Sequence, residues 1–89
     1  MNKVVIYTKN YCPFCKQAKH LLASKGIAFE EIDVTFDPAG QQQMVERSGR
    51  RTVPQVFVGE QHVGGSDDLA AAARDGSLDE LMRAEPTTA

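Results

Sequence analysis

Two cysteines, Cys12 and Cys15, are the residues of this chain whose type and spacing point most directly to chemistry. They are the only cysteines in the 89 residues, and they enclose the dipeptide Pro-Phe directly after the apolar run 4–7. A Cys-x-x-Cys pair between a strand and a helix is typical of a thiol–disulfide exchange site. With one helical turn between the two thiols, their sulfurs can form or open a disulfide. The spacing therefore indicates a reversible two-electron reaction.

The two thiols are expected to have unequal roles. Cys12 lies where a helix should begin, so the N–H groups of the first turn and the positive end of the helix dipole stabilise its thiolate. Pro13 suits the first helical turn and stiffens the loop between the thiols. Cys15 lies one turn further in, where its sulfur is more buried. We therefore expect Cys12 to be the exposed thiolate that attacks and Cys15 to resolve, with Tyr11 and Phe14 as an apolar rim.

Two further segments could hold a substrate against these thiols. If the Val53-Pro54 bond were cis, the backbone of Val53 would face outward and could pair with an extended, peptide-like substrate. Proline statistics alone favour a trans bond, because only about 5–6% of such bonds are cis. The Gly-Gly-Ser-Asp segment at 64–67 lets a ligand approach the backbone, and the start of the helix that follows can hold a carboxylate.

Length and composition bound the class of protein. The chain is 42% hydrophobic and 25% charged, which predicts one soluble domain over residues 1–85 with a flexible tail at 86–89. No apolar run approaches the roughly 20 residues that cross a bilayer, so we expect no membrane contact. The start of the chain lacks the features of a secretory signal, and we therefore expect a cytoplasmic protein. In a reducing compartment, catalysis or metal binding explains a single cysteine pair better than a structural staple.

The charges are distributed unevenly. Residues 1–25 contain five lysines and no acidic residue, and three of these lysines (Lys9, Lys16 and Lys19) are close in sequence to the cysteines. Their field favours a thiolate or an anionic ligand there, although Lys19 and Lys25 suit an ordinary solvated helix face. The basic residues are scattered and lack interleaved aromatics, which argues against nucleic-acid binding.

Hydrophobic periodicity predicts an α/β fold. Strands are expected at 3–7, 27–34, 53–58 and 61–63, and helices at 13–25, 38–48 and 66–76, with Ser66 as the cap of the last and a short final helix from Ser77. The spacing of Phe14, Ala18, Leu21 and Leu22 predicts the buried face of the first helix. The order βαβαββα predicts a four-stranded mixed sheet with helices on both faces, in which the first βαβ unit is parallel.

Taken together, the motifs resemble those of the glutaredoxins, specifically the dithiol (class I) type of bacteria. The resemblance covers nearly the whole chain and is carried by Tyr7-Thr8-Lys9, Cys12-Pro13-Phe14-Cys15, Thr52-Val53-Pro54-Gln55-Val56-Phe57 and Gly64-Gly65-Ser66-Asp67-Asp68-Leu69. It implies a thioredoxin-like fold, a cis peptide before Pro54 and glutathione as the working partner. It also implies that the protein reduces glutathionylated proteins and protein disulfides through Cys12 and Cys15, without a metal.

The resemblance assigns one end of a glutathione site to residues near the cysteines. Val53 would pair its backbone with the cysteinyl part of glutathione, next to Pro54. Lys9 and Gln41, with help from Tyr11, would hold the glycine carboxylate.

The other end of that site would hold the γ-glutamyl group. Ser66 and Asp67 would bind it, through backbone N–H groups at its carboxylate and through the Asp67 side chain at its ammonium. Thr52 and Gly65 would line the groove. Many relatives carry a third cysteine where this chain has Ser66. The chain therefore lacks that route to a further disulfide or to dimerisation, and we expect a monomer.

Three alternatives remain at this point. Cys12 from two chains could hold a [2Fe–2S] cluster with two glutathiones, although Pro13 and Cys15 argue against such a carrier. Thioredoxin reductase could replace glutathione as the electron source, which Lys9, Gln41 and the 65–67 segment argue against. A zinc site could combine both cysteines with His20 and His62, but the histidines lack a recognisable ligand spacing and are expected on the surface.

Overall fold

Residues 3–83 are described in the computed structural model, and they contain four strands and four helices. In chain order the elements are β1 (Val4–Thr8), α1 (Pro13–Ser24), β2 (Glu30–Asp33), α2 (Pro38–Ser48), β3 (Gln55–Val58), β4 (Gln61–Gly64), α3 (Ser66–Asp75) and α4 (Ser77–Arg83). The predicted order and the short final helix are confirmed. The tail predicted at 86–89 lies outside the described residues. No helix within residues 3–83 is long and apolar enough to cross a membrane.

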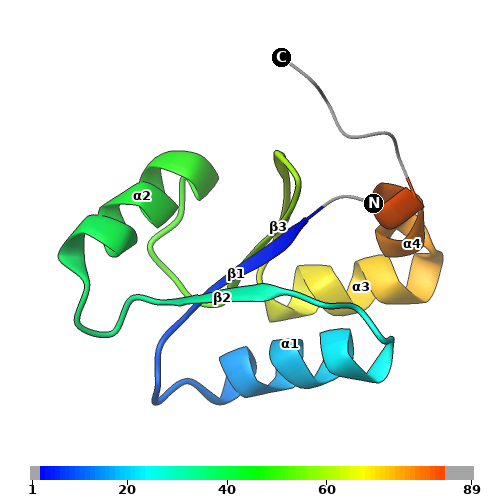
Figure 1. Ribbon diagram of the computed structural model, residues 1–89, viewed down its shortest axis with the longest axis horizontal. Coiled ribbons are helices and arrows are strands. Elements are labelled where there is room, and N and C mark those ends of the chain that lie inside the picture. Colours follow the sequence, from blue (N-terminus) through cyan, green and yellow to red (C-terminus); the bar gives the residue numbers. More distant parts are fainter. Residues whose placement is uncertain (1–2, 84–89) are drawn as a thin grey trace.

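The sheet has the strand order β2-β1-β3-β4 (Figure 1). Strand β1 pairs in parallel with β2, with Val5 opposite Glu30, and it pairs antiparallel with β3, with Val5 opposite Phe57. Strand β4 returns antiparallel to β3. The predicted mixed sheet is therefore confirmed, and β2, which exposes Glu30 and Glu31, forms one edge.

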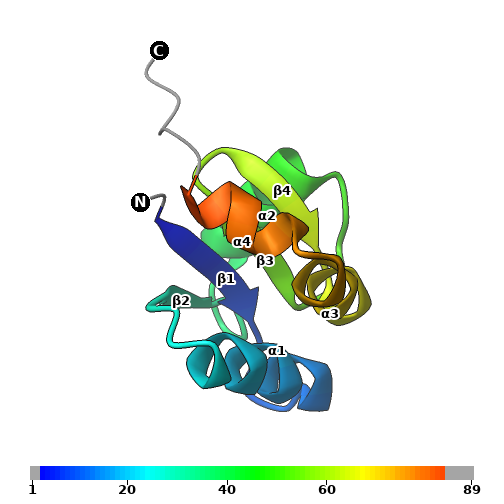
Figure 2. The ribbon, with the colours of Figure 1, turned by 90° about the vertical axis from the view of Figure 1, so that its right-hand side faces the viewer.

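Alternation along the strands gives the sheet two separate cores. Val4 and Ile6 of β1 point to the face covered by α1, α3 and α4, where they meet Leu22 and Leu69. Tyr7 points to the opposite face and packs with Met44 of α2 and with the core residues Val34 and Phe57. Helices on both faces are thus confirmed, and Figures 1 and 2 show α2 alone on its side of the sheet.

Several predicted boundaries are wrong by one to three residues, and three of the differences lie at the starts of elements. Strand β2 starts at Glu30 rather than residue 27, because the Ile27 N–H bonds to the Leu22 carbonyl as α1 ends. Strand β3 starts at Gln55, so Pro54 stands before the sheet and removes no ladder donor. The N-cap of α3 is Gly65, and Ser66 is already its first residue.

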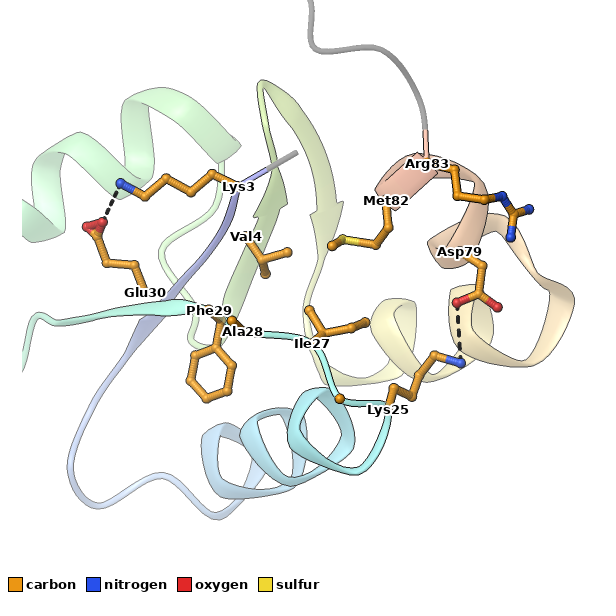
Figure 3. Close-up of a pocket in the computed structure, with 11 residues that line it drawn as sticks. Lys3, Val4, Lys25, Ile27, Ala28, Phe29, Glu30, Asp79, Met82 and Arg83 are labelled. Atoms are coloured by element: carbon orange, nitrogen blue, oxygen red, sulfur yellow. Dashed lines mark ion pairs between the residues drawn. The ribbon is translucent and has the colours of Figure 1, made fainter. Parts of the chain in front are cut away.

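A large hollow lies between the start of β1, residues 25–30 and α4 (Figure 3). It has a volume of about 640 Å³, and its apolar lining includes Val4, Phe29 and Met82. Two ion pairs border it, Lys3–Glu30 at 2.7 Å and Lys25–Asp79 at 3.4 Å. Neither cysteine lines this hollow, so it is not a place for thiol chemistry.

A polar cluster joins β1, β2 and α1 on the side of the sheet that carries the cysteines. The Glu31 carboxylate accepts hydrogen bonds from the Thr8 hydroxyl at 2.6 Å and from the Lys19 ammonium at 2.9 Å. These bonds, from Thr8 first and Lys19 second, lower the pKa of Glu31. As predicted, Lys19 is an ordinary helix-face lysine, and its charge is neutralised by this ion pair.

The Glu31 cluster predicts a pH-dependent part of the stability. Because its pKa is lower in the folded protein, the charged carboxylate stabilises the fold at neutral pH, and this contribution is lost as the pH falls through the folded pKa. Glu31→Gln should lower the free energy of unfolding at pH 7 by roughly 1 kcal/mol or less, since both side chains of the ion pair are about one-third exposed. Urea unfolding of the wild-type protein and the variant should show a smaller difference in the free energy of unfolding at pH 3 than at pH 7. The control is Glu30→Gln, which removes only the more exposed ion pair with Lys3. If Glu31→Gln lowers the free energy of unfolding as much at pH 3 as at pH 7, the assignment is refuted.

Candidate active site

Cys12 is the residue that caps α1, directly before Pro13. Its Sγ accepts a hydrogen bond from the Cys15 N–H at 3.3 Å, in the position where a serine or aspartate oxygen often serves as the cap. Its thiol also donates to the Val53 carbonyl at 3.7 Å. The sulfur therefore lies at the positive end of the helix, as predicted, between α1 and the segment before β3.

The burial of the two thiols differs in the predicted direction. Both cysteines are free thiols, and Cys12 is 8% exposed whereas Cys15 is 1% exposed. The expectation of an exposed Cys12 is wrong in degree, because the Val53 carbonyl lies against its sulfur. Phe14 is 56% exposed and does not belong to the buried face of α1, which holds Cys15, Ala18 and Leu22.

Cys15 is held in its neutral form. Burial is the main reason that its pKa is raised to about 12; the backbone of Lys9 lowers the pKa, and the neighbouring Cys12 thiol raises it by less than burial does. At neutral pH, Cys15 is therefore a thiol and a poor nucleophile until its proton is removed. This is the asymmetry that unequal roles for the two sulfurs require.

The Val53-Pro54 peptide bond is cis, as the family resemblance implies. Val53 is half-buried and Pro54 is buried. A hollow of about 250 Å³ opens beside this segment, and its walls come from the 50–54 segment, the start of α3 and α1. It is lined by Phe14, Arg50, Thr52, Val53, Pro54, Gly65, Ser66, Asp67 and Asp68. This one hollow thus contains six of the residues predicted for the glutathione site, namely 52–54 and 65–67.

Arg50 was not predicted as a site residue, and Asp68 was named only as part of the 64–69 motif. The Asp68 carboxylate accepts from the Gly65 N–H at 3.0 Å and pairs with the Arg50 guanidinium at 3.0 Å. Both bonds lower the pKa of Asp68, and the bond from Arg50 has the larger effect. Gly64 has a φ of +125°, and a Cβ there would collide with this carboxylate, so the close packing requires glycine. The three-residue spacing from Gly65 to Asp68 could have indicated that the Asp68 carboxylate accepts from the N-cap N–H, whereas nothing local indicates the Arg50 partner.

A second hollow, of about 440 Å³, contains two of the other predicted residues, Lys9 and Gln41. The loop 34–38 forms the rest of its wall. The Gln41 amide donates to the Arg51 carbonyl at 3.4 Å, and its buried oxygen has no hydrogen-bond partner among the described residues. Tyr11 is 70% exposed and lines neither hollow.

Cys12 is connected to both hollows by hydrogen bonds. Its N–H donates to the Lys9 carbonyl at 3.3 Å, and its thiol donates to the Val53 carbonyl at 3.7 Å. Lys9 lines the second hollow and Val53 the first. Cys12 lines neither hollow itself, but it is hydrogen-bonded to one residue of each.

Neither histidine lines either hollow. His20 is exposed on α1. His62 is half-buried rather than on the surface, and its Nε2 lies 2.7 Å from the buried Gln55 oxygen. Within residues 3–83, no group of three or more His, Cys, Asp or Glu side chains is placed to hold a metal ion.

A dithiol at the start of a helix, following the central strand of a β2-β1-β3-β4 sheet, defines a thiol–disulfide oxidoreductase with a thioredoxin-like fold. A family model described as Glutaredoxin matches residues 4–63. Glutaredoxin 3 of Escherichia coli K12 is 49% identical over 83 residues, which are 93% of this chain and the whole of that protein. The chain belongs to the glutaredoxin family.

Solved structures agree with this placement. The solution structure of glutaredoxin from Brucella melitensis has a TM-score of 0.82 and 52% identity, covering 93% of this chain and 90% of the other. The crystal structure of a buckwheat glutaredoxin–glutathione complex has a TM-score of 0.81 and 33% identity, covering 91% of this chain and 76% of that one. The similarity thus includes the fold as well as the sequence.

The raised pKa of Cys15 predicts a large difference in reactivity. In the Cys12→Ser variant, the folded protein should react with iodoacetamide at pH 7.5 at least about a hundredfold more slowly than a free cysteine, because almost no Cys15 thiolate is present. The reaction is followed by mass spectrometry, and the same variant unfolded in guanidinium is the control. Alkylation of folded Cys12→Ser at the unfolded rate would show that burial does not protect Cys15.

Proposed function

We propose that this protein is a glutathione-dependent oxidoreductase that reduces glutathione mixed disulfides and protein disulfides. The observation that carries the proposal is the position of Cys12, which hydrogen-bonds a residue of each of two hollows. One hollow offers the Lys9 ammonium, and the other offers the first turn of α3, where backbone N–H groups favour an anion. A tripeptide with a carboxylate at each end fits this pattern, and the glutathione complex of the buckwheat relative supports it.

In this proposal glutathione lies extended across Cys12. The Val53 backbone pairs with the cysteinyl residue beside Pro54, while Lys9 and Gln41, helped by Tyr11, hold the glycine carboxylate. Ser66 and Asp67 hold the γ-glutamyl group, and Thr52 and Gly65 line the groove. This set is supported by the shared hollow at 52–54 and 65–67 and by the Lys9–Gln41 hollow. Tyr11 has the weakest support because it lines neither hollow.

The reaction proceeds by two exchanges at Cys12. Its thiolate attacks the glutathione sulfur of a mixed disulfide, the new S–S bond forms, and the protein thiolate leaves. A second glutathione thiolate then attacks the Cys12–glutathione disulfide, which releases glutathione disulfide and restores the Cys12 thiolate. Each step exchanges one S–S bond for another. The net reaction converts the mixed disulfide and one free glutathione into the protein thiol and glutathione disulfide, one half of which came with the substrate.

Protein disulfides require Cys15. Attack by Cys12 leaves a mixed disulfide with the substrate, and Cys15 then attacks Cys12, forms the intramolecular disulfide and expels the second substrate thiolate. Because Cys15 has a pKa of about 12, its proton must be lost as it attacks, and the departing thiolate is a suitable acceptor. Two glutathiones then reduce the Cys12–Cys15 disulfide.

We also propose that the protein acts in the cytoplasm as a monomer. A dithiol in the reduced form suits a reducing compartment such as the cytoplasm. Ser66 stands where many relatives carry a further cysteine, which suits a monomer, with residues 1–85 as one domain.

The test is an assay coupled to glutathione reductase and NADPH, applied to Cys12→Ser and Cys15→Ser. Cys12→Ser should lose more than about 100-fold in rate with every disulfide substrate, since it lacks the attacking sulfur. Cys15→Ser should keep the reduction of a glutathionylated peptide and lose the reduction of a protein disulfide. Substantial activity of Cys12→Ser would refute the roles. Turnover with thioredoxin reductase and NADPH, but none with glutathione, would refute the electron source.

A further inference from the structure

A fully buried glutamine is the first residue of β3, directly after Val53 and Pro54. Gln55 is 0% exposed, and the three residues that follow it in the strand are buried and apolar. It lines neither of the two hollows beside Cys12, so it does not contact a ligand that occupies them. A buried polar side chain costs free energy unless its polar atoms are hydrogen-bonded, and glutamine is therefore uncommon in a core. The bonds that Gln55 makes indicate its role.

Both polar atoms of the Gln55 side chain are bonded. Its Nε2 donates to the Thr52 carbonyl at 3.0 Å and to the Thr52 hydroxyl at 3.2 Å, and its Oε1 lies 2.7 Å from Nε2 of His62. A carbonyl oxygen can only accept, so the amide nitrogen must face Thr52 and the amide oxygen must accept from His62. The His62 ring thus carries a proton on Nε2. Burial, and after it the charge of Arg50, lower the pKa of His62, so the ring is neutral at pH 7.

Side chains hold the segment between α2 and β3 in place. Each of the four consecutive carbonyls at 50–53 accepts a hydrogen bond from a side chain, and in chain order the donors are Ser48, Gln41, Gln55 and Cys12. Gln55 differs from the other three donors because it is completely buried and belongs to the sheet, where it pairs with Tyr7 of β1. Its amide is therefore the support that connects this segment to the sheet.

We propose that Gln55 and His62 are positioning residues that hold Thr52 and Val53 in the conformation that binds glutathione. This inference deepens the proposed function and rests on it, since the ligand is the glutathione group of that site. The Gln55 amide fixes the Thr52 carbonyl, and with it the peptide group that leads to Val53. The Thr52 hydroxyl accepts from Gln55, so its own proton stays available to donate to the ligand. His62 acts one step further away, because its N–H keeps the amide in the orientation that donates to Thr52.

The first test is Gln55→Met, which keeps the length of the side chain and removes its N–H donors. The substrate is the mixed disulfide of glutathione and mercaptoethanol, at saturating glutathione with glutathione reductase and NADPH. KM for the mixed disulfide should rise about fivefold or more, while kcat should stay within about twofold, because the bond from the Cys15 N–H to Cys12 is untouched. The matched control is Val58→Ala, which truncates another buried residue of the same strand. It should lower the melting temperature without raising KM.

A pair of variants at His62 tests the second link. His62→Gln keeps an N–H near the position of Nε2 and should have a KM within about twofold of the wild-type value, whereas His62→Leu should raise KM at least about threefold. Adding His62→Leu to Gln55→Met should raise KM no further, because both residues act through one amide. This pair also gives the answer if Gln55→Met does not fold, since His62 is only half-buried.

A wild-type KM in Gln55→Met, or an equal rise in Val58→Ala, would overturn the proposal and leave Gln55 a residue of the core. Equal KM values in the two His62 variants would overturn the role of His62.

NMR relaxation of the Thr52 and Val53 amides in the reduced protein needs no turnover. These amides should be more mobile in Gln55→Met than in the wild-type protein, and unchanged mobility would contradict the proposal. If the wild-type protein does not reduce the mixed disulfide, the proposed function fails, whereas the relaxation measurement still decides whether Gln55 holds this segment.

Discussion

Most of the site depends on one hydrogen bond, in which the Cys15 N–H donates to the Cys12 sulfur at the start of α1. A cap must accept an N–H of the first helical turn, and here the accepting atom is the nucleophile itself. The same spacing turns Cys15 inward by one turn, where burial raises its pKa to about 12. One local geometry therefore places the Cys12 sulfur at the start of the helix and keeps Cys15 buried and protonated.

The sheet brings the other components to that sulfur. Strand β1 runs toward Cys12, and its parallel partner β2 delivers the loop 34–37 at the same end. Strand β3 is antiparallel to β1 and so starts there, just after Val53 and Pro54. Strand β4 runs back and ends at Gly64, directly before the start of α3. Three segments that are distant in sequence thus lie at the end of the sheet that carries Cys12, whereas Cys12 does not line the hollow between β1 and α4 (Figure 3).

Features that depend on short stretches of sequence were predictable. The helix that begins after Cys12, the second helix at 38–48 and the first strand each depend on near neighbours, and each is confirmed. The Arg50–Asp68 pair joins residues 18 apart in the chain and has no local signal. The burial of Cys12 likewise depends on Val53, 41 residues away. Phe36, in the loop between β2 and α2, is 90% exposed, which its apolar type does not predict.

The central claim is that a ligand joined to Cys12 occupies both hollows, and amide chemical shifts of the Cys15→Ser variant test it most directly. The glutathione adduct is compared with the reduced protein and with a methylthio adduct, which modifies the same sulfur without filling a hollow. Shifts specific to glutathione are expected at Lys9, Gln41 and Val53 and over residues 65–67. Specific shifts confined to the immediate neighbours of Cys12, or located around residues 25–30 and α4, would contradict the claim.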